Sequence, residues 1–445
     1  MRSYKFIYRI VLCLLPFMVL CACLDELEIE TLGEEGQTPS LVVEAGLTDE
    51  VITQKVYLSR SSLHLDLETD TIYNPYIPLG SRPLDSVDME GGATVRVIGD
   101  NGAEFSFTED DEGIYLSNQQ FALEMGVSYI LEIETSSGVE YESDPLIVPG
   151  KSQLTNVYAE RAISDNGEEG IAIYADSEPQ QGNTQFYKYV YEETYKIVAP
   201  YWQKDDFRLT NYDPCALPVP TYTLEIVPRE IQNKVCYNTI SSTTIDQLST
   251  AGLPESNISG KLVRFIGKDN FVISHRYSIL VQQQVQSADA YSFYETLNSF
   301  SQSDNVFSQI QPGAIYANVH RKDGTSENVL GYVEALGVSD WRLFFNFDDF
   351  FPEEDLPQYA FGFNCGLYTS PESHGSYCSP DAGSDGCPQS VIEQVNLGLI
   401  CYYEDYYEGL VPNASCPGPY IFVPRICGDC TLLGSNVEPD FWVEE

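Results

Sequence analysis

Alternating apolar and polar residues occur in short runs through the first third of the chain and predict β-strands. Residues 93–98 (Ala-Thr-Val-Arg-Val-Ile) alternate with a period of two, and Asn101-Gly102 follows as a hairpin turn, because Asn-Gly tolerates positive φ. Residues 60–91 are rich in Pro, Asp and Ser, and we expect one long surface loop there. The pattern predicts an Ig-like or transthyretin-like β-sandwich over residues 40–150. Its other predicted strands are 41–45, 51–59, 103–107, 113–116, 129–134 and 139–143.

The region after residue 150 continues the strand pattern and adds one helix. Residues 288–300 have apolar positions at helical spacing, and Ser287 can cap the helix. We therefore predict a mainly β chain, with a second β-rich domain over 151–352 and a cysteine-rich, irregular tail over 353–445 packed on it. The predicted apolar face of the helix consists of Ala290, Tyr291, Tyr294, Leu297 and Phe300. The predicted strands of this domain are 157–160, 170–174, 186–195, 262–265, 277–283, 315–319, 329–333 and 341–345.

The chain begins with a basic and then apolar segment that is typical of a secretory signal. Arg2, Lys5 and Arg9 precede an apolar run over 10–20, which is too short to span the roughly 30 Å core of a bilayer. The next residues, Leu20-Cys21-Ala22-Cys23, resemble a bacterial lipobox, with Cys23 as the lipidated first residue after removal of a signal peptide over 1–22. The alternative is that Cys21 and Cys23 are ordinary cysteines of the signal.

An acidic segment follows the predicted lipidation site. Residues 24–30 (Leu-Asp-Glu-Leu-Glu-Ile-Glu) resemble the export signals that carry Bacteroidetes lipoproteins to the outer face of the outer membrane. A solvated acidic tether over residues 23–39 fits the same residues. We expect the lipid to anchor the protein to the outer membrane, on the cell-surface face.

The charge of the chain excludes some classes of partner. There are 23 Lys and Arg residues against 67 Asp and Glu, a formal net charge of −44. Removing residues 1–22 deletes Arg2, Lys5 and Arg9, which leaves about −47. This charge argues against nucleic acid, whose phosphates need a basic face, and against electrostatic docking on an anionic membrane. With 43% hydrophobic residues the chain is not disordered by composition, and its length suggests two domains.

Nine cysteines remain when Cys13, Cys21 and the lipidated Cys23 are set aside from the 12 in the chain. In an exported protein they are first of all candidates for disulfides. Because nine is odd, at least one thiol stays free or pairs between chains. The candidates are Cys215, Cys236, Cys365, Cys378, Cys387, Cys401, Cys416, Cys427 and Cys430.

A series of short motifs carries a resemblance to a known family. The motifs are 41–44 (Leu-Val-Val-Glu), 58–60 (Leu-Ser-Arg), 191–194 (Tyr-Glu-Glu-Thr), 236–239 (Cys-Tyr-Asn-Thr), 276–281 (Arg-Tyr-Ser-Ile-Leu-Val), 331–332 (Gly-Tyr) and the closing segment from Cys430 to Trp442. In this order they resemble the family filed as domain of unknown function 4249, which comprises Bacteroidetes outer-membrane lipoproteins. The loop 60–91 and the cysteines from Cys365 to Cys416 depart from its pattern. The resemblance implies no assigned activity, and it points to accessory lipoproteins of TonB-dependent outer-membrane transporters.

Residues of catalytic type are few, and none falls in a known catalytic spacing. The histidines are not at zinc-protease spacing, and the chain has no Gly-x-Ser-x-Gly motif, phosphate loop or dinucleotide fingerprint. The acidic cluster over 348–355 lacks the spacing of an EF-hand and fits a solvated loop better than a calcium site. Glu192 and Glu193 point to opposite faces of a strand and therefore cannot share a site on their own. We expect no metal, no cofactor and a structural role for His275. The other histidines are His64, His320 and His374.

Two further motifs lie in the tail. Cys427-Gly428-Asp429-Cys430 has the spacing of a redox disulfide or of half a zinc site, but it lacks a helix start and a second ligand pair. Disulfides to other cysteines are therefore expected. Four tyrosines interleaved with acids suit carbohydrate stacking or a protein partner, and the other interpretation is that half of them belong to the core. They are Tyr402, Tyr403, Tyr406 and Tyr407.

Together these patterns favour a non-enzymatic surface lipoprotein that helps a TonB-dependent receptor to capture a small-molecule, glycan or peptide ligand. The alternative is a surface hydrolase of glycosidase type, or an adhesin. A hydrolase would use carboxylates that the fold brings together from distant segments.

Overall fold

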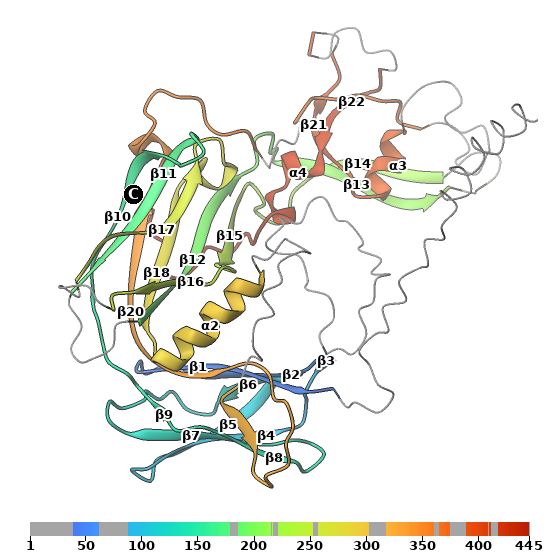
Figure 1. Ribbon diagram of the computed structural model, residues 1–445. Helices are drawn as coiled ribbons and strands as arrows, with labels where there is room; N and C mark the ends of the chain where they lie inside the picture. Colours follow the sequence, from blue (N-terminus) through green and yellow to red (C-terminus); the bar gives the residue numbers. More distant parts are fainter. Residues whose placement is uncertain are drawn as a thin grey trace, which may run out of the picture.

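The computed structural model describes residues 39–61, 88–178, 186–214, 216, 221–251, 257–301, 317–359, 365–373, 389–407, 409–410 and 417–444. The described chain is mainly β, as predicted, and forms two sandwiches, one above the other, and a lobe that projects from the upper one (Figure 1). The predicted signal peptide and the lipidation site Cys23 lie outside the described residues. Within these residues, no helix has the length and apolar character needed to cross a membrane.

The first sandwich is a sheet that folds back on itself. Its strands follow the order β1-β2-β6-β5-β4-β7-β8, and Figure 1 shows β1 and β2 above β4 and β7. Alternate residues of β1, among them Leu41, Val43 and Leu47, face the core. The predicted hairpin turn is present between β4 and β5, with Gly102 at a φ of +86°. The strands are β1 Leu41–Thr48, β2 Lys55–Arg60, β3 Asp88–Met89, β4 Thr94–Gly99, β5 Glu104–Asp111, β6 Ile114–Ser117, β7 Ser128–Glu134, β8 Glu140–Ser143 and β9 Leu146–Ile147.

The two ends of the predicted loop 60–91 meet in this sheet. β3 pairs with β2, so that Ser59 lies opposite Met89, and the Arg60 guanidinium lies 2.6 Å from the Glu90 carboxylate. Residues 62–87 lie outside the described residues, and the long surface loop stays a prediction for them.

The second domain packs two sheets face to face. The larger has the strand order β15-β12-β18-β20 and the smaller the order β10-β11-β17. Tyr187, Tyr189 and Tyr195 of β12 are buried in a core shared with Ile171 and Ile173 of β11. The elements are β10 Leu154–Ile163, β11 Glu169–Ser177, β12 Phe186–Val198, β15 Val235–Ser241, β16 Asp246–Ser249, β17 Ile258–Gly267, η2 Phe271–Ile273, β18 Tyr277–Val285, β20 Val333–Phe345 and η3 Phe347–Asp349.

The neighbouring glutamates of β12 face opposite sides of the sheet, as predicted. Glu193 is buried, and its Oε2 accepts hydrogen bonds from the Tyr277 hydroxyl at 2.6 Å and from Arg264 Nε at 3.1 Å. Arg264 belongs to β17 of the smaller sheet. Glu192 instead lies 3.6 Å from Arg342 Nη2 on β20. Glu193 therefore ties the two sheets of the domain together and has a structural role.

Strand β20 belongs to both sandwiches. Its first residues pair in parallel with β1, where Val333 lies opposite Ala45, and its later residues pair antiparallel with β18, where Gly337 lies opposite Val285. Asp49 binds β20 where the strand passes from one sandwich to the other. Its amide donates to Leu336 O at 3.1 Å, and its Oδ1 accepts from Val338 N at 2.8 Å. One strand therefore runs from the first sheet into the second.

The segment before β20 returns to the first sandwich, which corrects the predicted domain range 151–352. β19 (Val319–Arg321) pairs with β8, and Val319, Val329 and Val333 are buried in the core of the first sandwich. These residues share the core with Leu41 and Val43 of β1 and with Tyr141 of β8. Periodicity predicts the strands near 319 and 333 but not the sheet they join.

The predicted helix is present as α2 (Ala288–Ser301) and lies between the two sandwiches (Figure 1). The Ser287 hydroxyl accepts a hydrogen bond from the Ala290 amide at 3.1 Å, which confirms the predicted cap. Phe293 and Tyr294 pack against Tyr332, with ring centroids 4.8 and 6.5 Å apart. The prediction was wrong for Leu297, which is exposed although it lies on the same side of the helix as these rings, one turn further along. The side chain of Phe300 lies outside the described part.

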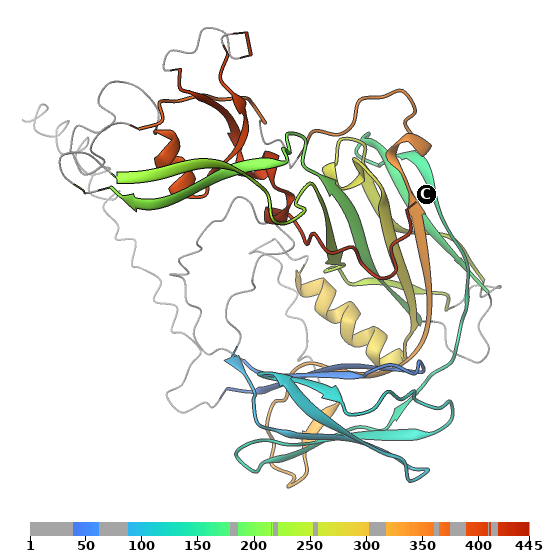
Figure 2. The ribbon, with the colours of Figure 1, turned by 180° about the vertical axis from the view of Figure 1, so that it is seen from behind.

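The lobe combines a hairpin from the middle of the second domain with the tail. The hairpin was not predicted, and the tail is more regular than the predicted loop, because its strands pack on the hairpin. Phe207 and Leu224 of the hairpin pack on a small core of Val391, Ile400 and Phe422. Both views show the lobe projecting clear of the first sandwich (Figure 2). Its elements are β13 Asp205–Asp213, β14 Thr221–Pro228, α3 Val391–Asn396, β21 Ile400–Asp405, β22 Tyr420–Pro424, α4 Arg425–Gly428 and η5 Cys430–Leu432.

The last residues of the chain are bound to the larger sheet of the second domain. Trp442 is 7% exposed and packs edge-on against Tyr237, with ring centroids 4.9 Å apart. Arg276 Nε donates to Val443 O at 2.5 Å, and Lys196 Nζ lies 2.6 Å from Glu444. The closing segment thus stabilises β12, β15 and β18 from outside.

We expect the substitution Gly331→Ala to destabilise the protein strongly. Gly331 has a φ of +82°, and an added Cβ would lie 2.2 Å from Val43 O of β1. The left-handed backbone costs an alanine about 1–2 kcal/mol, and the clash adds to this, so the free energy of unfolding should fall by about 2–4 kcal/mol in urea denaturation.

The matched control is Gly138→Ala in the turn between β7 and β8. Gly138 also has a positive φ, of +80°, but an added Cβ meets nothing within 4 Å. It should lower the free energy of unfolding by about 1 kcal/mol. Equal losses in the two variants would contradict the close approach of the 329–332 segment to β1.

Candidate functional site

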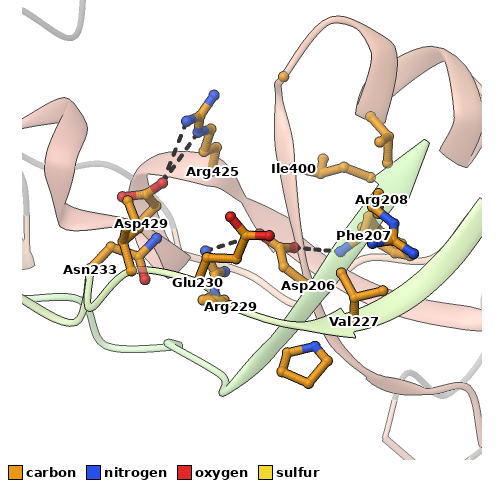
Figure 3. Close-up of a pocket in the computed structure, with 14 residues that line it drawn as sticks. Asp206, Phe207, Arg208, Val227, Arg229, Glu230, Asn233, Ile400, Arg425 and Asp429 are labelled. Atoms are coloured by element: carbon orange, nitrogen blue, oxygen red, sulfur yellow. Dashed lines mark hydrogen bonds and ion pairs between the residues drawn. The ribbon is translucent and has the colours of Figure 1, made fainter. Parts of the chain in front are cut away.

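A cavity of about 660 Å³ lies in the lobe, between the base of the β13–β14 hairpin and the tail (Figure 3). One wall comes from residues 206–208 and 227–233, and the other comes from residues between 395 and 429. The two walls are far apart in the sequence, and the fold brings them together. The lining residues are Asp206, Phe207, Arg208, Val227, Pro228, Arg229, Glu230, Ile231, Asn233, Val395, Gly398, Ile400, Arg425 and Asp429.

A partly buried ion pair forms the base of the cavity. The Arg229 side chain is only 8% exposed, its Nη1 lies 2.9 Å from Asp206 Oδ2, and its Nε donates to Gln203 O at 3.0 Å. Asp206 Oδ1 in turn accepts from the amides of Phe207 at 2.9 Å and Tyr402 at 2.8 Å. Because Tyr402 is on β21, Asp206 joins the hairpin to the tail. This pair has a positioning role: it sets the distance between the two walls.

A second pair of charges lies on the tail wall. Arg425 is 41% exposed, and its Nε and Nη2 lie 3.4 and 3.5 Å from Asp429 Oδ2. The other oxygen of Asp429 accepts from the Thr431 amide at 3.0 Å and from its hydroxyl at 2.6 Å. Gly398 leaves room for this guanidinium, because a Cβ there would lie 3.1 Å from Arg425 Nη1. Asp429 is therefore fixed in place, whereas Arg425 keeps donors open to the cavity.

The lining determines what chemistry the cavity can support. It offers guanidinium and carboxylate groups beside the apolar side chains of Phe207, Val227, Val395 and Ile400. None of the described residues that line it is a serine, cysteine or histidine. Such a lining can hold a ligand by charge and apolar contact, and the described lining residues include no serine or cysteine nucleophile paired with a histidine.

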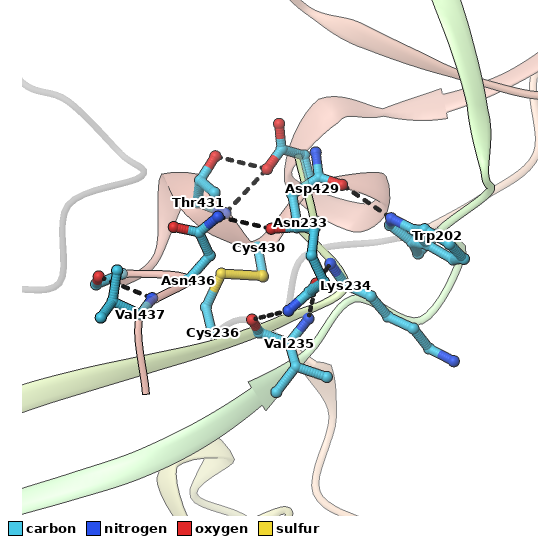
Figure 4. The surroundings of a disulfide bond; sticks show 12 residues. Trp202, Asn233, Lys234, Val235, Cys236, Asp429, Cys430, Thr431, Asn436 and Val437 are labelled. Carbon is cyan, nitrogen blue, oxygen red and sulfur yellow. Dashed lines mark hydrogen bonds between the residues drawn. A yellow bond between two sulfur atoms is a disulfide. The ribbon is translucent and has the colours of Figure 1, made fainter. Parts of the chain in front are cut away.

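One disulfide holds the tail wall to the second domain, and another cross-links the tail itself. Cys236 of β15 pairs with Cys430, 194 residues away in the sequence (Figure 4). Cys365 pairs with Cys427, 62 residues away. Each cysteine of the Cys427–Cys430 motif thus pairs with a distant partner, as expected. Asn233 of the cavity lies beside the first disulfide, since its carbonyl accepts from the Cys430 amide at 3.0 Å and its side-chain oxygen accepts from Trp202 Nε1 at 2.8 Å.

Cys401 is the one free cysteine among the residues that the structure describes, and it is buried. Burial raises the pKa of its thiol to about 12, and the nearby Asp206 carboxylate adds to this rise. The remaining candidates, Cys215, Cys378, Cys387 and Cys416, lie outside the described residues.

The four tyrosines of the tail do not form one exposed patch. Tyr402 packs edge-on against Phe207 at 5.5 Å, and Tyr403 packs on Tyr201 at 5.7 Å. Burial, followed by a hydrogen bond to Asp405, raises the pKa of Tyr402 to about 12. Successive strand residues face opposite sides, which separates these two rings. Tyr406 is half-buried and Tyr407 is 51% exposed, so the interpretation that half of them pack inside fits better.

The other candidate residues stand apart from this cavity. His275 lines a smaller cavity of about 320 Å³, where burial and then the charge of Lys196 lower the pKa of the imidazole. In the 348–355 cluster, Asp349 accepts from the Asn346 amide and Glu354 pairs with Lys268. No group of three or more His, Cys, Asp or Glu residues in the described ranges could hold a metal ion. His320 is exposed near Glu142, and His64 and His374 lie outside the described residues.

The fold and the cavity define a class: a β-protein of two joined sandwiches with a cavity in a disulfide-linked lobe. The chain belongs to the family described as Domain of unknown function (DUF4249), whose profile matches residues 25–342. This confirms the resemblance carried by the motifs of the sequence. No curated protein matches the chain. The matched range ends within β20, so it includes the hairpin wall of the cavity but not the tail wall or the closing motif.

Sequence reasoning missed the cavity because its charged residues belong to no motif. Asp206 and Arg229 bracket a hairpin that alternation alone could have indicated, since residues 221–227 (Thr-Tyr-Thr-Leu-Glu-Ile-Val) alternate with a period of two. Arg425 lies two residues before the Cys427–Cys430 motif and is part of no recognisable sequence motif. These residues line one cavity because the disulfides and the packing of the tail place the tail against the hairpin.

We expect Cys401 to resist alkylation in the folded protein. With a thiol pKa of about 12, roughly one thiol in 10⁴ is ionised at pH 8, so iodoacetamide should label it at least about a thousandfold more slowly than in the unfolded chain. Because the pH stays below this pKa, the rate should rise about tenfold per unit between pH 8 and 10 while the fold persists. Peptide mapping by mass spectrometry locates the label. Equal rates in the folded and unfolded protein, or no label after unfolding without reductant, would contradict a buried free thiol.

Proposed function

We propose that the protein is a non-enzymatic, surface-exposed outer-membrane lipoprotein that binds a nutrient ligand in partnership with a TonB-dependent transporter. The observation that carries this proposal is the lobe cavity, whose lining suits binding and whose tail wall is held by disulfides. Membership of the family and the lipobox at Cys23 support the membrane part of the proposal.

The proposal assigns a role to each part of the chain. The acyl chain on Cys23 anchors the protein, and residues 24–40 connect it to β1, so the first sandwich is the part nearest the anchor in the sequence. The lobe projects from the second domain, clear of the first sandwich (Figure 2), and we assign ligand binding to its cavity. A net charge of −44 before cleavage keeps the protein from adhering to an anionic membrane surface, so contact with the membrane depends on the lipid.

The test of this proposal uses full-length protein expressed with its signal in its native membrane. Wild-type protein should enter the detergent phase on Triton X-114 partitioning, and a β-barrel receptor should co-purify with it from mildly solubilised outer membrane. The substitution Cys23→Ser should move the protein to the aqueous phase, because lipidation supplies the anchor.

Cys21→Ser is the matched control, since it alters a cysteine of the same motif and should leave partitioning unchanged. Surface labelling of intact cells should reach the wild-type protein. Retention of Cys23→Ser in the detergent phase would contradict the anchor, and the consistent absence of a β-barrel partner would contradict the transporter partnership.

A further inference from the structure

Two charged side chains of opposite sign lie on opposite walls of the lobe cavity with incomplete pairing. Arg425, on the tail wall, approaches Asp429 only to 3.4 Å, longer than the roughly 2.7–2.9 Å of a strong charged hydrogen bond. Glu230 follows β14 on the hairpin wall and is exposed. Within the described chain its carboxylate has neither an ion pair nor a hydrogen bond. Each of these groups can therefore take a ligand group of the opposite charge.

The rest of the lining limits the class of ligand. Three arginines are balanced by three carboxylates, so the cavity does not concentrate positive charge as a site for a polyanion would. A ligand that carries one charge of each sign fits this balance. The charged residues are Arg208, Arg229, Arg425, Asp206, Glu230 and Asp429.

Apolar groups lie between and around these charges. Phe207, Val227, Val395 and Ile400 line the cavity, and a volume of about 660 Å³ falls in the usual range for ligand sites. Ile231 also lines it while remaining 60% exposed. Two further leucines flank the lining residue Gly398 and are exposed to water. They are Leu397 at 52% and Leu399 at 41%.

We infer that the lobe cavity binds a short peptide by its ends, with the C-terminal carboxylate at Arg425, the N-terminal ammonium at Glu230 and apolar side chains on the walls between them. A peptide has one positive and one negative terminus and apolar side chains, which is the combination that the lining offers. The inference rests on the proposed function and deepens it by naming the class of ligand. The Asp206–Arg229 pair at the base of the cavity positions the two walls and need not touch the peptide.

Calorimetric titration of the purified full-length protein tests this inference without any receptor. The probes are the tripeptide Ala-Leu-Phe, its C-terminal amide and its N-acetylated form. The free tripeptide should bind, and each modification should weaken binding about tenfold or more, because it removes one charged contact. This comparison uses the wild-type protein and does not depend on the folding of any variant.

Two substitutions then assign each terminus to its residue. Arg425→Gln should abolish the difference between the free tripeptide and its amide, and Glu230→Gln should abolish the difference between the free and acetylated forms. The control is Arg96→Gln on β4, an exposed arginine whose Nε lies 2.6 Å from Glu132, outside the lobe. It should leave all three affinities unchanged.

The inference is overturned if the free tripeptide gives no binding at millimolar concentration, if acid and amide bind equally, or if Arg425→Gln keeps the difference between them. The result is independent of the receptor test. If a receptor co-purifies but the titration shows no binding, only the assignment of a peptide ligand is contradicted. If the tripeptide binds but no receptor co-purifies, the partnership with a transporter is contradicted and the class of ligand is supported.

Discussion

The continuity of β20 from one sandwich to the other is the constraint on which the rest of the structure depends. At the crossing, the Glu334 carboxylate is buried and accepts hydrogen bonds from Lys188 Nζ and Gln286 Nε2, each at 2.6 Å. Lys188 also lies 4.3 Å from the centre of the Tyr294 ring on α2. A buried pair of this kind costs about 3–5 kcal/mol to break from one side. The first sandwich, the second domain and the helix between them are thus fixed to one another at a single place.

The larger sheet of the second domain, to which β20 belongs, also fixes the position of the lobe. The hairpin β13–β14 leaves the sheet after β12 and returns into β15, and the disulfide from Cys236 of β15 to Cys430 brings the tail back to the same strands. The Tyr201 amide donates to Cys427 O at 3.0 Å beside the second disulfide. A cavity with its two walls attached to one sheet is pre-organised, which reduces the entropy lost when a ligand binds.

Local patterns in the sequence predicted where helices and strands form better than they predicted which strands pair with one another. Alternation found the strands around Val97 and Ile279, and apolar spacing with Ser287 found α2, because these features depend on neighbours within a few residues. The return of Val319 and Val333 to the first sandwich depends on contacts with strands far earlier in the chain. No local rule gives that pairing.

The candidate site was less predictable than the fold for the same physical reason. The cysteine motif indicated that the tail is cross-linked, but connectivity is set by three-dimensional proximity, and only the structure pairs Cys427 with Cys365. Arg425 and Glu230 belong to opposite walls and have no shared motif. The tyrosine cluster was visible in sequence, yet strand geometry sends Tyr402 and Tyr403 to different neighbours.

Hydrogen–deuterium exchange across β20 tests the central claim most directly. If the two sandwiches form one unit through this strand, amides of β1, β18 and both halves of β20 should exchange with the same free energy of opening and should lose protection together as urea is raised. Exchange of β1 and residues 333–336 at a much lower free energy than β18 and residues 337–345 would contradict the account, because it would show two sandwiches that open independently.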